Sequence, residues 1–202
     1  MEFSALLVTA TELETKCLHE VLEPRNGNAN IEKIHEDNQT YFAGTFGKYN
    51  VLHVQCGMGS LSRNGSTLTI SEAIRRWKPN AVIMLGIAFG VNEERQRIGD
   101  VLVSTSVVSY EQQRVSQNEV IQRGVATISG TKLTNRFLNT KDWIHKLPDD
   151  NSANIYYGML LSGEKLIDNL EFKKRLTDAY PEAIGGEMEG AGVTDHLKMH
   201  HL

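Results

Sequence analysis

The segment ALLVTATELE, residues 5–14, carries the local signals that decide the fold class. Residues 5–8 form a short continuous apolar run, which is typical of a strand buried on both faces. Thr11, followed three residues later by Glu14, has the capping-box pattern of a helix start. Apolar side chains then recur at helical spacing until Pro24. The segment is therefore predicted to be a strand, a turn and a helix.

Later segments continue this alternation of strands and helices. Residues 41–46 and 49–54 are strand-like, and the Gly47-Lys48 pair between them indicates a hairpin. A helix is predicted to end near Trp77, and the all-apolar run 81–85 predicts a buried strand. Further strands are predicted over 101–108 and 155–161, and further helices over 133–147, 169–180 and 187–199. Residues 25–38 are predicted to form a loop that contains an edge strand near 31–34. This order indicates an α/β layered domain with a largely parallel sheet and hairpin additions.

Composition excludes several classes of protein. The 202 residues are 40% hydrophobic and 23% charged, with 4 prolines and 17 glycines, so the chain is neither disordered nor fibrous. A formal charge of −4 lacks the basic footprint of a non-specific nucleic-acid binder. Cys17 and Cys56 form no C-x-x-C pair, which argues against a zinc site or disulfide framework and favours a cytoplasmic location. No apolar stretch approaches the ~20 residues of a membrane-spanning helix. Because the net charge disfavours nucleic-acid binding, a small molecule is the expected partner.

Three turns follow predicted strands and are candidates for ligand binding: residues 9–14, 56–62 and 86–90. In open α/β sheets, ligands collect at the carboxyl ends of strands, where loops and free N–H groups converge. The 57–59 sequence, Gly-Met-Gly, lacks the third glycine of a dinucleotide fingerprint and the Gly-Lys-Ser/Thr of a P-loop. Neither of these two nucleotide-binding motifs is therefore predicted.

The segment GGEMEGAG, residues 185–192, places two carboxylates on either side of Met188. A carboxylate can accept hydrogen bonds from the vicinal hydroxyls of a sugar, and a thioether can lie against an apolar ribose face. The alternative is a solvated helix start, where acidic residues interact favourably with the helix dipole. The surrounding glycines weaken such a helix, but both interpretations stay open on local physics alone.

Taken together and in order, four segments resemble the nucleoside phosphorylase and nucleosidase superfamily, above all the methylthioadenosine/S-adenosylhomocysteine nucleosidases. They are VTATELE at 8–14, CGMG at 56–59, LGIAFG at 85–90 with IGDVLVS at 98–104, and LSGE at 161–164 with GEMEGA at 186–191. A weaker likeness, at 110–114 and 162–166, is to nucleosidase domains attached to immune and antiviral receptors. The resemblance covers nearly the whole chain and implies a three-layer α/β sandwich whose central mixed, largely parallel sheet is flanked by helices.

The resemblance also implies a reaction and a set of site residues. Glu14 would orient or deprotonate the water that attacks the anomeric carbon of ribose, as bases do in glycoside hydrolysis generally. The capping interaction with Thr11 is the competing role for the same side chain. The implied ribose contacts are Met188 and Glu189 with Glu187 in support; the implied base contacts are Ala88, Phe89, Leu166 and Ile167; and the implied pocket-loop residues are Gly57, Met58, Gly59 and Gly86. Because Leu166 stands where the family has an aromatic residue, Phe89 is expected to supply an aromatic face to the base.

Water is favoured over phosphate as the nucleophile. Phosphorylases of this superfamily hold phosphate with arginines and a hydroxyl, whereas Ile87 occupies the hydroxyl position and residues 9–11 contain no arginine. Arg63, Arg114 and Lys165 could meet the phosphates of a nucleotide, but such long cations are more often solvated surface groups. The expected activity is hydrolysis of the N-glycosidic bond of a purine nucleoside or nucleotide, with phosphorolysis as the alternative.

The carboxyl-terminal part departs from the family pattern. Family members continue with a strand ending in Ser-Asp, whose aspartate protonates the leaving base, and residues 196–202 do not match it. The expectation is a single phosphorylase-like domain over 1–202 that is truncated and lacks its last strand; a non-catalytic nucleoside-binding module is the rival interpretation. Asp195 aligns poorly with the missing acid, and the His196/His200 pair is more typical of a surface than of a metal site. The resemblance implies neither a metal nor an organic cofactor. It does imply a homo-oligomer.

Overall fold

The computed structural model describes residues 2–25, 27–60, 64–111, 113–115, 120–122, 124–140, 142–164 and 170–199. The chain divides into two compact units. The first consists of Met1–Ile87 and Glu189–Leu202, and the second of Ala88–Met188.

The first unit is built on a mixed five-stranded sheet with the order β2-β3-β4-β1-β5. The inner strand β1 runs parallel to both its neighbours, β4 and β5, whereas β2, β3 and β4 form an antiparallel meander. The strands are β1 (Ala5–Thr9), β2 (Glu32–Glu36), β3 (Gln39–Phe46), β4 (Tyr49–Gln55) and β5 (Val82–Met84), and the helices are α1 (Glu12–Val21), α2 (Ser66–Trp77) and α5 (Gly190–Met199).

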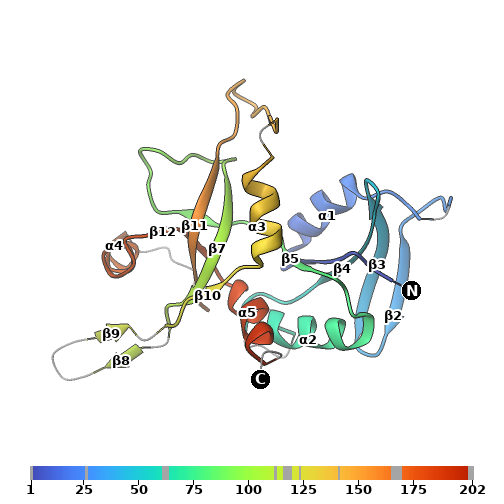
Figure 1. Ribbon diagram of the computed structural model, residues 1–202, viewed down its shortest axis with the longest axis horizontal. Helices are drawn as coiled ribbons and strands as arrows, with labels where there is room; N and C mark the ends of the chain where they lie inside the picture. Colours follow the sequence, from blue (N-terminus) through green and yellow to red (C-terminus); the bar gives the residue numbers. More distant parts are fainter. Residues whose placement is uncertain are drawn as a thin grey trace. The chain divides into compact units, whose positions relative to one another are not determined.

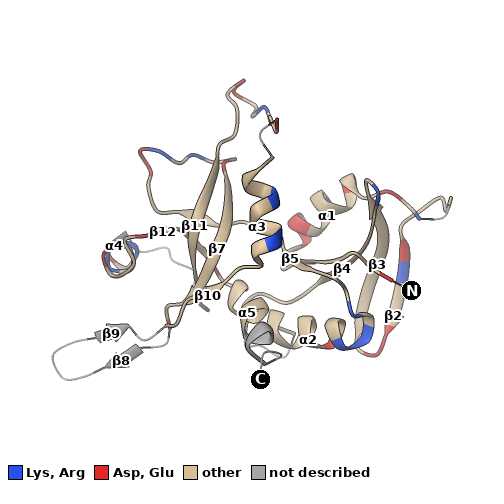
Figure 2. Ribbon diagram, viewed as in Figure 1, with Lys and Arg blue, Asp and Glu red and all other residues tan. Residues whose placement is uncertain are grey.

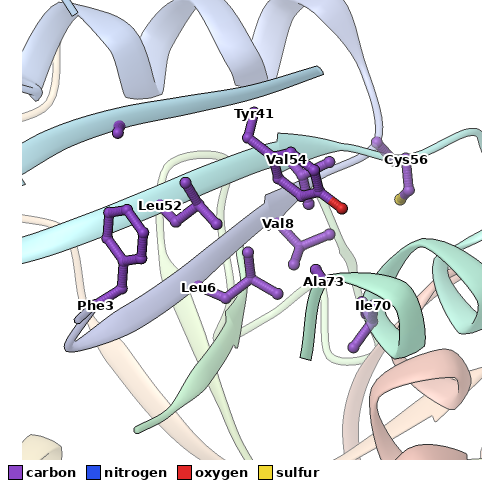
Figure 3. Packing of buried hydrophobic residues seen from close by; sticks show 11 residues of the cluster. Phe3, Leu6, Val8, Tyr41, Leu52, Val54, Cys56, Ile70 and Ala73 are labelled. Carbon is purple, nitrogen blue, oxygen red and sulfur yellow. The ribbon is translucent and has the colours of Figure 1, made fainter. Parts of the chain in front are cut away.

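Helices cover both faces of this sheet (Figure 1). Successive side chains of a strand point to opposite faces, and β1 is buried on both. Leu6 and Val8 pack with Ile70 of α2 in the larger core, which Figure 3 shows from close by. Leu7 points the other way and packs with Leu18 of α1. The continuous apolar run of β1 is thus explained by a helix layer on each side.

The second unit contains another mixed five-stranded sheet, with the order β10-β7-β11-β12-β6. The three inner strands are parallel and the two edge strands are antiparallel to them. The strands are β6 (Phe89–Gly90), β7 (Val101–Ser109), β10 (Thr127–Ile128), β11 (Ile155–Ser162) and β12 (Ala183–Glu187), with a separate pair β8 (Gln113–Val115) and β9 (Val120–Gln122), and the helices are α3 (Thr131–Leu138) and α4 (Leu170–Ala179). Phe172 and Leu176 of α4 pack against Val108, Tyr110 and Leu161.

The α/β class predicted from the sequence is confirmed, but two helix boundaries are wrong. The helix predicted over 133–147 ends at Leu138, because Asn139 Nδ2 and Thr140 Oγ1 bond back to the carbonyls four residues before them and compete with further helix. The helix predicted over 187–199 begins at Gly190, since Glu187 ends strand β12.

Strand β12 was hidden by its glycines, which leave no apolar alternation to detect. Gly185 and Gly186 are glycines for a packing reason. A Cβ on Gly185 would lie 2.4 Å from the carbonyl oxygen of Phe89, and one on Gly186 would lie 2.5 Å from the Phe89 ring. The close approach of β6 therefore excludes side chains at both positions.

Charged residues lie mainly on helices and loops, and among the inner strands of both sheets only β12 contains one, Glu187 at its carboxyl end (Figure 2). This distribution follows from the cost of burying unpaired charge. None of the helices in the described ranges is both long and apolar enough to cross a membrane.

Candidate active site

Glu14 lies in the first turn of α1, where its carboxylate joins two loops. Oε2 accepts hydrogen bonds from the backbone N–H groups of Ala10 and Thr11, each at 2.9 Å. Oε1 accepts a third, also 2.9 Å long, from the N–H of Ile87 in the loop after β5. The half-buried carboxylate is thus fixed at the carboxyl ends of two adjacent parallel strands. Figure 2 shows the acidic start of α1 lying beside β5.

The capping box and the site geometry coexist in this one side chain. Thr11 Oγ1 accepts a hydrogen bond from the Glu14 N–H at 3.2 Å, and the Glu14 carboxylate accepts one from the Thr11 N–H. Only Oε2 takes part in the cap, so Oε1 reaches Ile87. The two roles that compete in the sequence are therefore divided between the two carboxylate oxygens.

Gly86 leaves the space that this arrangement requires. A Cβ at this position would lie 3.1 Å from Oε1 of Glu14, closer than most Cβ contacts. The missing side chain at residue 86 therefore lets the loop after β5 approach the carboxylate closely, at the distance where the Ile87 N–H bonds to it.

Glu189 is held at the start of α5 by two other segments of the first unit. The Gly59 N–H donates to Oε1 of Glu189 at 3.0 Å, and Ser66 Oγ donates to its backbone carbonyl at 2.6 Å. Gly59 has a φ of +83°, a backbone conformation that favours glycine. The predicted pocket loop and the predicted ribose carboxylate are thus in direct contact.

The base candidates Ala88 and Phe89 and the ribose candidates Glu187 and Met188 lie in the second unit. Phe89 in β6 pairs with Gly186 of β12, and Glu187 ends β12, where its carbonyl accepts from the Gly163 N–H at 3.2 Å. Ala88 and Met188, the first and last residues of this unit in the sequence, are half-buried. Leu166 and Ile167 lie outside the described residues.

Sequence inspection missed several groups that shape the site. The Ile87 N–H and the Ser66 hydroxyl could not be assigned from pattern, although Gly86 is a signal of close backbone approach. Also missed was a buried histidine, His53, whose imidazole bonds to Thr9 and His19. Burial first, and then the neighbouring His19, lower the pKa of His53 to about 3, so this ring is neutral at physiological pH.

An open pocket of about 450 Å³ lies beside α1 and is lined by Glu12, Thr15, Lys16, His19, Glu20 and Gln55. None of the predicted site residues lines this pocket. Within the ranges that the structure describes, no group of three or more His, Cys, Asp or Glu side chains is arranged to hold a metal ion.

The geometry places a fixed glutamate beside glycine turns at strand ends, and the sequence profile that matches is that of the Phosphorylase superfamily, over residues 1–195. The chain belongs to this superfamily. It is 30% identical over 219 aligned positions to a death domain-containing ATP nucleosidase of Amphimedon queenslandica, with 98% of this chain covered. The chain spans about 40% of that relative's length.

Two further proteins are similar to this superfamily member, one in sequence and one in structure. A 5'-methylthioadenosine/S-adenosylhomocysteine nucleosidase of Desulfotalea psychrophila is 25% identical over 171 residues, which cover 83% of this chain and 70% of the relative. The solved structure of such a nucleosidase from Colwellia psychrerythraea 34H, in complex with adenine, superimposes with a TM-score of 0.78 at 20% identity. The superposition covers 99% of this chain and 78% of the other, and it confirms the fold.

Proposed function

We propose that this chain hydrolyses the N-glycosidic bond of a purine nucleoside or nucleotide and releases the free base. The single observation that carries the proposal is the Glu14 carboxylate, held by three backbone N–H groups at the carboxyl ends of β1 and β5. Membership of the superfamily and the names of the relatives, an ATP nucleosidase and a methylthioadenosine nucleosidase, support the same reaction class.

The hydrogen bonds of Glu14 suit a group that activates water. An ionised carboxylate offers about four acceptor positions, and the three N–H groups use three of them. The remaining one can accept a proton from a water molecule without any rearrangement of the side chain. Such preorganisation is favourable because little reorganisation is then needed during the reaction.

In the proposed reaction, the bond between the anomeric carbon and the purine nitrogen lengthens, and positive charge develops on the ribose ring. Glu14 takes a proton from water as the water oxygen bonds to the anomeric carbon. The departing purine nitrogen takes up a proton from solvent and Glu14 returns its proton to solvent, so that one water is added across the broken bond and the carboxylate is regenerated. Glu189, fixed by the Gly59 N–H, accepts hydrogen bonds from ribose hydroxyls, and Met188 lies against the sugar.

Hydrolysis is favoured over phosphorolysis by the partner of the Ile87 N–H. This N–H is the backbone donor at the position where phosphorylases of the superfamily have a hydroxyl residue. Here it donates to Oε1 of Glu14, a negatively charged neighbour that would repel a phosphate. Phe89 supplies the aromatic face for the base, with Ala88, Leu166 and Ile167 as its further contacts.

The proposal is tested by measuring base release from adenosine, methylthioadenosine and ATP, with and without phosphate. Release without phosphate that falls by about 100-fold or more in Glu14→Ala is the expected result, in line with the removal of a general base. A requirement for phosphate would reassign the chain as a phosphorylase. No release by the wild type, together with thermal stabilisation by a nucleoside, would identify a binding module instead.

The proposal extends to assembly and location: a homo-oligomeric, cytoplasmic protein. Leu13, Met58 and Ile87, adjacent in sequence to site residues, expose 60%, 57% and 69% of their surface, and a second copy would cover such apolar groups. Light scattering coupled to size-exclusion chromatography tests the assembly, and a monomer at micromolar concentration would contradict it. The buried Cys56 thiol, which donates to the Thr9 carbonyl, suits a reducing compartment.

A further inference from the structure

A chain of five side-chain hydrogen-bonding groups crosses the first unit from β4 to α1. Thr15 Oγ1 donates to Gln55 Oε1 at 3.0 Å, and Thr15 Oγ1 lies 2.7 Å from Thr9 Oγ1. Thr9 Oγ1 lies 2.9 Å from His53 Nε2, and His53 Nδ1 lies 2.9 Å from His19 Nε2. Thr9 and His53 are fully buried, so their polar atoms depend on these partners.

The amide of Gln55 fixes which group donates and which accepts along the whole hydrogen-bond chain. Its Nε2 donates to the carbonyl of Ala10 at 3.4 Å, so its Oε1 is the atom that faces Thr15. A hydroxyl has a single proton, and Thr15 gives its proton to Gln55. Thr15 must therefore accept the hydrogen bond from Thr9.

The same reasoning assigns the tautomers of both histidines. Because the Thr9 proton goes to Thr15, Thr9 Oγ1 accepts from His53, which must carry its proton on Nε2. His53 Nδ1 is then an acceptor and receives the Nε2–H of His19. The hydrogen-bond chain requires a neutral His53, which agrees with the lowered pKa that burial produces.

This hydrogen-bond chain holds its side chains in place and does not carry protons. It ends on the amide oxygen of Gln55, which does not release a proton onward, and it reaches the Glu14 carboxylate through no side chain. What it does instead is close the base of the turn between β1 and α1: Thr9 ends the strand, and Thr15 follows Glu14 directly. Gln55 also fixes the carbonyl of Ala10, whose N–H binds Glu14.

We propose that this hydrogen-bond chain positions the Glu14 carboxylate, and that Thr15 and Gln55 are positioning residues for the reaction assigned to Glu14. The inference rests on the proposed function for its catalytic consequence. Both residues also line the open pocket beside α1, and neither belongs to the buried hydrophobic clusters of the first unit.

The first test replaces Thr15 by valine, which has the same shape but no hydroxyl. Both of its hydrogen bonds are lost and the Thr9 hydroxyl loses its acceptor, so the turn loosens around Glu14. We expect kcat for base release to fall about tenfold with KM changed less than about threefold, since small misplacements of a catalytic group reduce turnover strongly. Thr15→Ser restores the hydroxyl and is expected to restore kcat.

The matched control is Thr40→Val. Thr40 also pairs its hydroxyl with a histidine, His35 Nδ1 at 3.1 Å, but in the exposed β2–β3 hairpin. We expect wild-type kcat for this variant. A loss of kcat equal to that of Thr15→Val would mean that general destabilisation explains both results and would overturn the inference.

A double-mutant cycle separates positioning from a merely structural role. In a Glu14→Ala background, Thr15→Val is expected to cause no further loss of kcat, because its effect passes through the missing carboxylate. A full additional tenfold loss in that background would overturn the inference, as it would show that Thr15 acts independently of Glu14.

Hydrogen exchange provides a readout that needs no activity. We expect Thr15→Val to increase amide exchange several-fold at Ala10, Thr11 and Ile87, the three donors to Glu14, and Thr40→Val to leave it unchanged. If the wild type releases no base, the proposed function fails while this experiment still decides the positioning inference. Gln55→Met serves the same tests if Thr15→Val does not fold, and wild-type exchange at these amides in a folded variant would overturn the inference.

Discussion

The backbone N–H of Ile87 and Oε1 of Glu14 are joined by a 2.9 Å hydrogen bond that links positions 73 residues apart in the sequence. The bond connects the loop after β5 to the first turn of α1, the two ends of adjacent parallel strands β5 and β1. It gives the Glu14 carboxylate an orientation that the local capping box could not impose, because the cap uses only Oε2.

Gly86→Ala should weaken this link. The new Cβ would lie 3.1 Å from Oε1 of Glu14, so the carboxylate or the loop must shift by a few tenths of an ångström. We expect kcat for base release to fall by about 10-fold, a smaller effect than removal of the carboxylate itself. Gly130→Ala is the control, since its Cβ would meet nothing within 4 Å. Equal kcat values for the two variants would argue against the importance of this contact.

Thr11→Ala should destabilise the first unit without removing the Glu14 carboxylate. The substitution deletes the oxygen that accepts the Glu14 N–H, and loss of such an N-cap costs about 1 kcal/mol of folding free energy. Urea unfolding followed by circular dichroism measures the change. Thr11→Ser keeps the hydroxyl and should match the wild type; the same midpoint for the alanine and serine variants would contradict the role of the cap.

Gly192→Ala should disturb the crossing of α2 and α5. A Cβ at Gly192 would lie 2.1 Å from Ser66 Oγ and 2.6 Å from the Thr67 nitrogen, so the helices must move apart. We expect a loss of about 1–3 kcal/mol in stability, the usual cost of overpacking. Because Ser66 Oγ holds the Glu189 carbonyl, KM for the nucleoside should rise as well. Unchanged stability and KM would show that the two helices separate without consequence.

Acid should destabilise the protein through His53. Its folded pKa is about 3, because burial disfavours the charged ring, whereas the unfolded value is about 6.5. The unfolded state therefore binds more protons between these values, so stability is complete above about pH 6.5 and is lost as pH falls toward the folded pKa. His19, whose pKa is lowered by burial and by Lys33, contributes with the same sign.

The expected size of this acid effect is about 2 kcal/mol for His53 between pH 6.5 and 5, at about 1.4 kcal/mol per pH unit. Urea unfolding at a series of pH values measures it. His53→Gln should flatten the profile between pH 7 and 5, because glutamine does not titrate. A variant profile as steep as that of the wild type would assign the acid sensitivity to other groups.

Elements with strong local patterns could be predicted from the sequence. The apolar run of β1, the Thr11–Glu14 cap and the helical spacing up to Pro24 each depend on neighbours within one or two turns, and all appear in the structure. The β3–β4 hairpin was predictable for the same reason, because its turn chemistry is local. Strand β12 and the end of α3 were not, since glycine packing and side-chain back-bonding interrupt the expected periodicities.

The sequence by itself determined the α/β class, the position of Glu14 at a strand end and the glycine turns that could approach a ligand. Only the tertiary structure decided what those groups bond to: the Ile87 N–H on Glu14, the Gly59 N–H on Glu189, and the directed chain from Gln55 to His19. Local patterns reflect dihedral preferences and the periods of strands and helices. Contacts between residues 73 or 130 positions apart depend instead on sheet order and helix packing, which no local window contains.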